Sequence, residues 1–91
     1  MTEAFDTPEI DRTLRSVLSD VLGLDRARVD AFDARTELFG SMPEFDSMAV
    51  AGVLTELEDR LAIVIEDDEV DGEMLETFGA LKTFAARKAL V

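Results

Sequence analysis

The sequence predicts an all-α fold: a small antiparallel bundle of three main helices plus one short helix, with a long loop between helices one and two. Three stretches repeat apolar residues at intervals of three and four, which is typical of amphipathic helices. The β-branched run at 63–65 is too short for a sheet and has no partner run. With 91 residues, 47% of them apolar, one modest core is expected. Residues 1–6 are expected to be a flexible lead, and residues 7–91 a single helical domain.

The first helix is predicted over about residues 8–22. Thr7 is a suitable N-cap, Pro8 fits the first helical position, and Gly23 is a suitable stop just beyond the end. The predicted apolar stripe of this helix consists of Ile10, Leu14, Val17, Leu18 and Val21.

The segment from Leu24 to Phe45 shows no lasting periodicity, although it is long for a connection in a compact domain. It carries too many apolar side chains for a mobile linker: Leu24, Val29, Phe32, Leu38, Phe39, Met42 and Phe45. We therefore predict a packed connection with one short helical turn near 36–39.

The second helix is predicted to begin at Asp46 or Ser47 and to end at about Leu61. Its predicted inward stripe consists of Met48, Ala51, Leu54, Leu57 and Leu61, widened by Val50 and Val53. A glycine inside a helix costs about 1 kcal/mol relative to alanine. Gly52 therefore indicates either a close approach by another surface or a glycine that good packing tolerates, and both interpretations stay open.

The remainder of the chain is predicted to hold a buried connector at 63–65, a short helix near 67–71 and a last helix over about 73–90. The last helix would turn inward Leu75, Phe78, Leu81, Phe84 and Ala85.

The net charge of −12, from 21 acids against 9 bases, makes nucleic acid and anionic membranes poor partners and basic protein surfaces suitable ones. The chain has no cysteine and no histidine, which excludes disulfides, thiolate chemistry and the commonest general base. We find neither an apolar run of membrane-spanning length nor a signal pattern, so a cytoplasmic protein without membrane insertion is expected.

The acidic run after residue 65 resembles the start of a calcium loop, with acids at 67, 69 and 71 and a glycine at 72. Such a loop needs a glutamate at its twelfth place, where this chain has Phe78. We therefore predict no metal site, and interpret the run as a solvated acidic face that can also dock a basic partner.

Ser47 stands where a long loop meets a helix, and its simplest role is that of a helix cap. Asp46 can fill that role alone, which leaves the Ser47 hydroxyl pointing outward. A serine hydrolase is excluded, because the chain has no histidine, no Gly-x-Ser-x-Gly elbow and no lysine three residues away. The position does offer the positive end of a helix to a phosphate, which Glu44 and Asp46 oppose slightly.

Asp46-Ser47-Met48, followed by Leu54, Leu57-Glu58-Asp59 and Leu61, resembles the signature of acyl carrier proteins, and the likeness extends over about residues 8–88. The resemblance implies a free-standing carrier, not an enzyme. A phosphopantetheinyl transferase would attach 4′-phosphopantetheine from coenzyme A to Ser47, and the thiol of this arm would carry acyl groups as thioesters. The reaction chemistry would belong to the arm and to partner enzymes.

Within this resemblance, two departures bear on docking. Met48 replaces the commoner leucine, and residues 49–53 lack the acids that carriers of fatty acid synthesis usually have there. Acyl-loading and acyl-transferring enzymes with basic patches are the implied partners of a monomeric carrier, and acyl chains would shelter between helices near Met48, Ala51 and Met74. The residues expected to dock partners are Asp46, Met48, Gly52, Glu56, Glu58 and Asp59.

The sequence of residues 43–50 is similar to that of carriers associated with exopolysaccharide and exosortase gene clusters. Two alternatives stay open: an aminoacyl or peptidyl carrier, and an acidic helical interaction module whose Ser47 is never modified.

Overall fold

The computed structural model of the protein describes residues 8–89, which form five α-helices and one short 3-10 helix. The predicted all-α class is confirmed. The expected Thr7 cap, the lead over 1–6 and residue 90 lie outside the described residues. In chain order the helices are α1 (Pro8–Leu22), α2 (Arg26–Asp30), α3 (Ser47–Leu61), the 3-10 helix η2 (Asp67–Glu69), α4 (Gly72–Glu76) and α5 (Phe78–Ala89).

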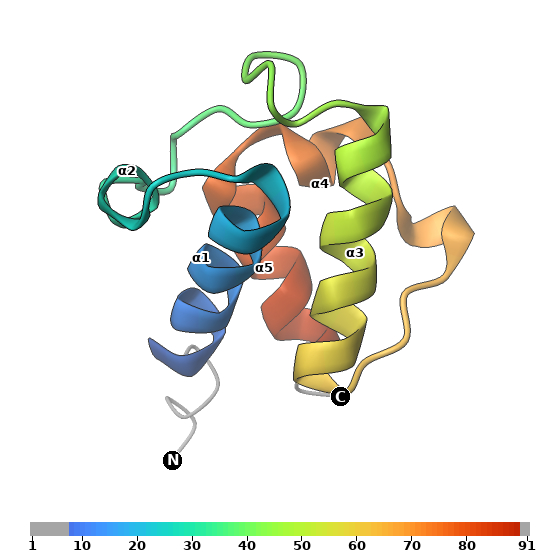
Figure 1. The fold of residues 1–91 in the computed structure, drawn as a ribbon. Helices are drawn as coiled ribbons and strands as arrows, with labels where there is room; N and C mark the ends of the chain where they lie inside the picture. The colour runs from blue at the N-terminus through green and yellow to red at the C-terminus, as the bar shows by residue number, and fades with distance from the viewer. Residues whose placement is uncertain (1–7, 90–91) are drawn as a thin grey trace.

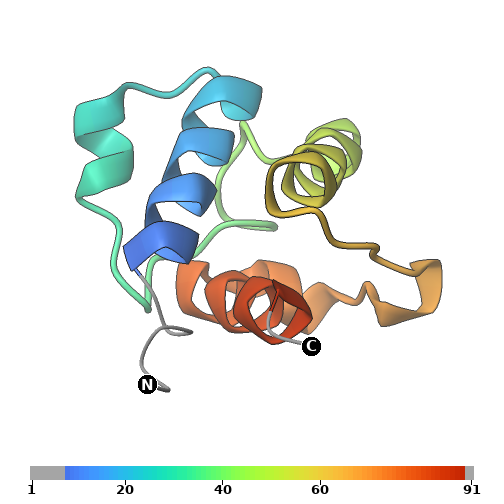
Figure 2. The same cartoon turned by 90° about the horizontal axis from the view of Figure 1, so that it is seen from below.

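The core lies between α1, α3 and α5. Helices α1 and α3 pack side by side and run in opposite directions, and α5 lies across one side of this pair and contacts α1 (Figures 1 and 2). The short helix α2 packs on α1, and α4 packs on α5. Fully buried core side chains include Leu14, Val17, Leu18, Val53, Leu57, Phe78 and Leu81.

Helix α1 confirms the predicted bounds and most of the predicted stripe. Ile10, Leu14, Val17 and Leu18 are buried, whereas Val21 is only half-buried at the edge of the core. The helix ends as expected at Gly23, whose φ of 69° is one that glycine adopts without strain.

The loop after α1 is a packed connection, as predicted, but its helical turn is not at 36–39. The short helix is α2, over Arg26–Asp30. Residues 36–39 instead pair with the chain around Thr77: the Leu38 N–H donates to the Glu76 carbonyl (2.8 Å), and the Phe78 N–H to the Thr36 carbonyl (2.9 Å). These bonds across the fold replace the local ones that a helical turn would make.

The same pairing divides the predicted last helix in two. Thr77 is extended (φ −132°, ψ 161°), so that α4 ends at Glu76 and α5 begins at Phe78. Each new helix start is capped by a side chain: Asp71 accepts from the Met74 N–H (2.9 Å), and Thr77 from the Ala80 N–H (3.1 Å).

Helix α3 has the predicted length but is rotated relative to the predicted stripe. Val53 and Leu57 are its buried residues, Ala51 is exposed, and the Met48 side chain is 84% exposed. The reason is that α1 covers the face of α3 that carries Gly52. Leu54 and Leu61 lie half-buried at the edge of the core.

After α3, the connector at 63–65 is less buried than predicted. Ile63 and Ile65 are half-buried, but Val64 is 66% exposed, because alternate side chains of an extended segment point to opposite sides. The short helix near 67–71 is confirmed as η2. Among residues 8–89, no helix combines the length and apolar composition that a bilayer crossing needs.

Candidate functional site

Ser47 is the first residue of α3 and is exposed. Asp46 precedes it in an extended conformation (φ −95°, ψ −175°), and its carboxylate accepts a hydrogen bond from the Ala49 N–H (2.9 Å). Asp46 is therefore the cap of this helix. Within the described part of the chain, the Ser47 hydroxyl takes part in no hydrogen bond, so it is available for modification without loss of the cap.

The segment that leads to Ser47 is held in place by the buried side chain and the backbone of Phe45. Phe45 is buried and packs edge-to-face on Phe39, with 6.1 Å between the ring centres. The Phe45 N–H donates to the Met42 carbonyl (2.9 Å). Ser47 therefore stands on an anchored turn rather than on a free loop.

A groove begins at Ser47 and follows one face of α3. Its lining residues on the helix recur at three- and four-residue intervals, and two residues of the following segment stand opposite. They are Ser47, Val50, Ala51, Leu54, Thr55, Glu58, Ile65 and Asp67. The apolar residues closest to Ser47 along the helix, Val50, Ala51 and Leu54, suit a chain of methylene groups.

On its other side, Ser47 borders a second hollow, which belongs to the preceding loop. It is lined by Phe39, Gly40, Ser41, Met42, Pro43, Phe45 and Asp46 together with Ser47. Ser47 therefore lies between two hollows, one formed by the preceding loop and one by the helix that follows.

The six residues expected to dock partners have different roles in the structure. Asp46 caps α3, and Met48 projects from the first turn next to Ser47. Gly52 is covered by α1: a Cβ placed on it would lie 3.1 Å from the Val21 Cγ1. The close approach suspected at this glycine thus comes from inside the molecule.

The three acids near the end of α3 also differ. Glu56 accepts from the Arg60 Nε (3.0 Å), and the same guanidinium reaches Asp20 of α1 (2.9 Å). Hydrogen bonding to Asp20 is the main cause that raises the pKa of Arg60. The Glu58 carboxylate accepts from the Ile65 backbone N–H (2.7 Å), whereas Asp59 is exposed.

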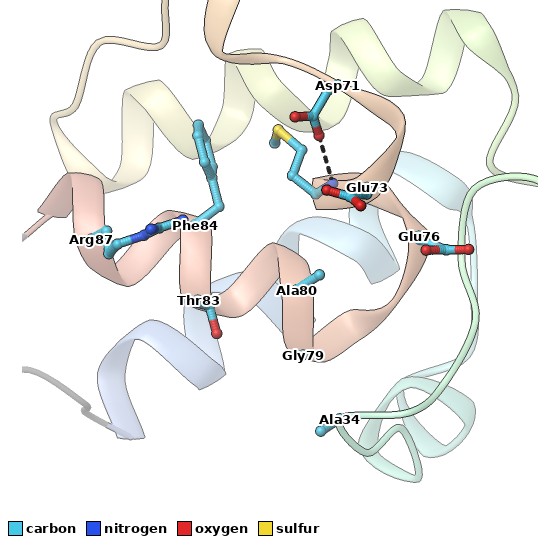
Figure 3. Close-up of a pocket in the computed structure, with 10 residues that line it drawn as sticks. Ala34, Asp71, Glu73, Glu76, Gly79, Ala80, Thr83, Phe84 and Arg87 are labelled. Carbon is cyan, nitrogen blue, oxygen red and sulfur yellow. Dashed lines mark hydrogen bonds between the residues drawn. The ribbon is translucent and has the colours of Figure 1, made fainter.

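A larger hollow lies between α4, α5 and the loop at Ala34 (Figure 3). None of the residues expected to hold the arm or dock partners lines it, whereas Met74, expected beside the acyl chain, does. Met74 and Phe84 form its apolar floor, Glu73 and Glu76 lie at its rim, and Arg87 lies at one end. In the described chain, no group of acidic side chains is arranged to hold a metal ion.

The sequence matches the family model described as the phosphopantetheine attachment site over residues 12–84, which is most of the chain. The chain belongs to the phosphopantetheine-binding family. Its structure is similar to the solution NMR structure of the holo acyl carrier protein of Nitrosomonas europaea, with a TM-score of 0.78 and 36% sequence identity. The match covers 90% of this chain and 96% of that one. A comparison with curated proteins finds no significant match.

This carrier therefore holds acyl groups on a covalently bound phosphopantetheine. Acyl carrier proteins work with phosphopantetheinyl transferases and with biosynthetic enzymes. In a carrier the reacting thiol is supplied by the arm.

The sequence did not indicate the far wall of the groove. The wall on α3 could have been found by counting from Ser47 in steps of three and four, which leads to Ala51, Leu54 and Glu58. Ile65 and Asp67 could not, because their place depends on how the chain turns back after α3.

Proposed function

We propose that Ser47 is the attachment residue of the phosphopantetheine arm. The observation that carries this proposal is an exposed hydroxyl on the first residue of a helix that Asp46 already caps. The Ser47 oxygen would form a bond to the pyrophosphate phosphorus of coenzyme A that carries the pantetheine. The bond from this phosphorus to the bridging oxygen would break, adenosine 3′,5′-bisphosphate would leave, and the hydroxyl proton would be lost. The resulting phosphodiester would lie at the positive end of α3, close to its first backbone N–H groups.

The test is the intact mass of the protein after incubation with coenzyme A, Mg²⁺ and a phosphopantetheinyl transferase of broad specificity. Wild type should gain one arm, and Ser47→Ala none, with unchanged helicity. Ser41→Ala is the matched control, because Ser41 is an exposed serine of the preceding loop. Loading of Ser47→Ala, or no loading of wild type by several transferases, would contradict the proposal and favour an unmodified interaction module.

We also propose that the groove along α3 shelters the cargo. The sequence predicts shelter near Met48, Ala51 and Met74, but only Ala51 lines this groove; Met48 is exposed and Met74 lines the hollow of Figure 3. Methyl NMR signals of Val50 and Ile65 should therefore move between the holo form and long-chain acyl forms. Unmoved signals would mean that the chain stays in solvent.

The partners in this proposal are the transferase and acyl-loading and acyl-transferring enzymes whose basic patches complement the net charge of −12. The strongest docking candidates are Asp46, Met48 and Asp59, which are exposed, whereas Gly52, Glu56 and Glu58 are half-buried. We further propose that the protein is a monomer, that it is cytoplasmic and that it is a carrier rather than an enzyme. The sequence of residues 43–50 supports the proposal that this carrier belongs to the type associated with exopolysaccharide or exosortase gene clusters.

A further inference from the structure

Glu58 accepts hydrogen bonds from three backbone N–H groups of the segment that follows α3. Its carbonyl accepts from Ala62 and from Ile63 (3.1 Å for Ile63), and its carboxylate accepts from Ile65 (2.7 Å). Ala62 has a left-handed conformation (φ 56°, ψ 47°), which turns the chain back toward the helix. One residue therefore ties this segment to α3 through both its backbone and its side chain.

The side-chain bond lies at the end of the groove opposite Ser47. Glu58 follows Ser47 by eleven residues on the same face of α3, which corresponds to about 16 Å along the helix axis. Ile65 stands on the facing wall. The bond from Ile65 to the Glu58 carboxylate thus joins the two walls where the groove ends.

We propose that Glu58 is a positioning residue that closes the far end of the groove and thereby limits the length of the acyl chain that the carrier shelters. The inference rests on the proposed attachment at Ser47 and on the groove as the shelter. A carboxylate is a poor neighbour for an alkyl chain, because displacing its hydrogen-bond donors without replacement is costly. One turn further along the same face lies Leu61, a half-buried apolar residue that would continue the groove if the end opened.

This role differs from the docking role expected of Glu58 from the sequence, and two variants separate them. Docking to a basic patch needs the charge, whereas closing the groove needs an acceptor for the Ile65 N–H. Glu58→Gln removes the charge and keeps an acceptor, and Glu58→Ala removes both. Asp59→Asn removes one charge from the neighbouring, exposed position and is the matched control.

The experiment first verifies by intact mass that wild type and the three variants carry the arm. Each is then loaded with saturated acyl chains from butyryl to palmitoyl, and the rise in melting temperature over the holo form is measured for each length. In wild type, Glu58→Gln and Asp59→Asn, we expect the rise to level off at one common chain length. In Glu58→Ala it should continue to longer chains, and the Ile65 amide of its holo form should exchange about tenfold faster than in wild type.

The results that would overturn the inference are distinct. A levelling-off in Glu58→Ala at the wild-type length, with faster Ile65 exchange, would make the bond structural only. A shift of the levelling-off to longer chains in Glu58→Gln, equal to that in Glu58→Ala, would show that the charge and not the acceptor is what matters. An absence of any levelling-off in wild type would also refute a closed end. Failure to load wild type would appear in the mass measurement and would refute the attachment at Ser47 instead.

Discussion

Gly52 of α3 lies so close to Val21 of α1 that a Cβ on residue 52 would be only 3.1 Å from the Val21 Cγ1. Such a distance is shorter than ordinary van der Waals contact between carbon atoms. The glycine therefore permits the close packing of the two helices that together form one side of the core.

The contact predicts that the effect of Gly52→Ala depends on residue 21. Alanine gains about 1 kcal/mol over glycine inside a helix, but Val21 is β-branched and has few alternative rotamers with which to yield. We expect Gly52→Ala to stabilise a Val21→Ala background by about 1 kcal/mol and wild type by clearly less. Urea denaturation of the four proteins of this double-mutant cycle measures the difference, and equal increments in both backgrounds would show that the contact is unimportant.

Gly79→Ala is expected to destabilise the fold by about 1–3 kcal/mol. A Cβ at this position would lie 2.7 Å from the Ala34 carbonyl oxygen and 2.9 Å from the Ala34 Cβ, so backbone would have to move. The movement would weaken the hydrogen bond from the Gly79 N–H to the same carbonyl (3.0 Å).

The matched control for this prediction is Gly72→Ala at the start of α4, where a Cβ would meet nothing within 4 Å. We expect thermal denaturation to show little change for Gly72→Ala and a clear loss for Gly79→Ala. Comparable losses in both would mean that glycine is needed for some reason other than space.

Asp46 is expected to stabilise α3 as its N-cap, independently of any contribution to partner binding. Asp46→Ala should lower the free energy of unfolding by about 1 kcal/mol, while Asp46→Asn, which keeps a capping oxygen, should change it little. Chemical denaturation gives the stabilities, and transferase kinetics on folded protein give the docking effect. If Asp46→Asn loads as slowly as Asp46→Ala, the charge of Asp46 contributes to recognition.

Asp11 is expected to make stability depend on pH. It contacts Arg15 within α1 and Lys82 of α5 (3.2 Å), and hydrogen bonding from Arg15 is the main cause that lowers the pKa of Asp11 below its usual 3.8. A carboxyl group with a lower pKa in the folded state stabilises that state above its unfolded pKa, and the contribution is lost as pH falls through the folded pKa.

The stability difference between wild type and Asp11→Asn should therefore be largest near neutral pH, at up to about 1 kcal/mol, and should shrink as the pH falls through and below 3.8. The comparison with the variant is essential, because protonation of other acids also relieves the repulsion of a chain with net charge −12. A difference that stays constant over this range would contradict a lowered pKa at Asp11.

Asp59→Lys is expected to weaken transferase binding about threefold to tenfold at low salt, and less at high salt, because exposed charges are screened. Glu73→Lys is the control, since Glu73 is an exposed acid on α4 at the hollow of Figure 3. Equal weakening by both substitutions would indicate that only the net charge matters to the partner.

The elements that could be predicted from sequence are those governed by local periodicity and end signals. Helix α1 ends before Gly23, and α3 begins directly after Asp46, as the stop signal and the capping signal indicate. Ser47 could likewise be chosen as the candidate site residue, because a serine directly after a capping aspartate is a local sequence pattern.

The features that could not be predicted depend on pairing between distant segments. The extended residue Thr77 splits the last helix only because residues 36–39 lie beside it. The rotation of α3 follows from where α1 packs, and the bond from Ile65 to Glu58 follows from the turn at Ala62. Periodicity within one element carries no information about these partners.

The pairing of residues 34–39 with residues 75–79 also sets an order of events during synthesis. The backbone groups of Leu38 and Phe39 have their partners in Glu76 and Leu75, which are made much later. Contacts between distant segments form only after the intervening chain is closed into a loop. We therefore expect the turn that presents Ser47 to mature only when residues 75–79 have left the ribosome, so that nascent chains ending before them are poor substrates for the transferase.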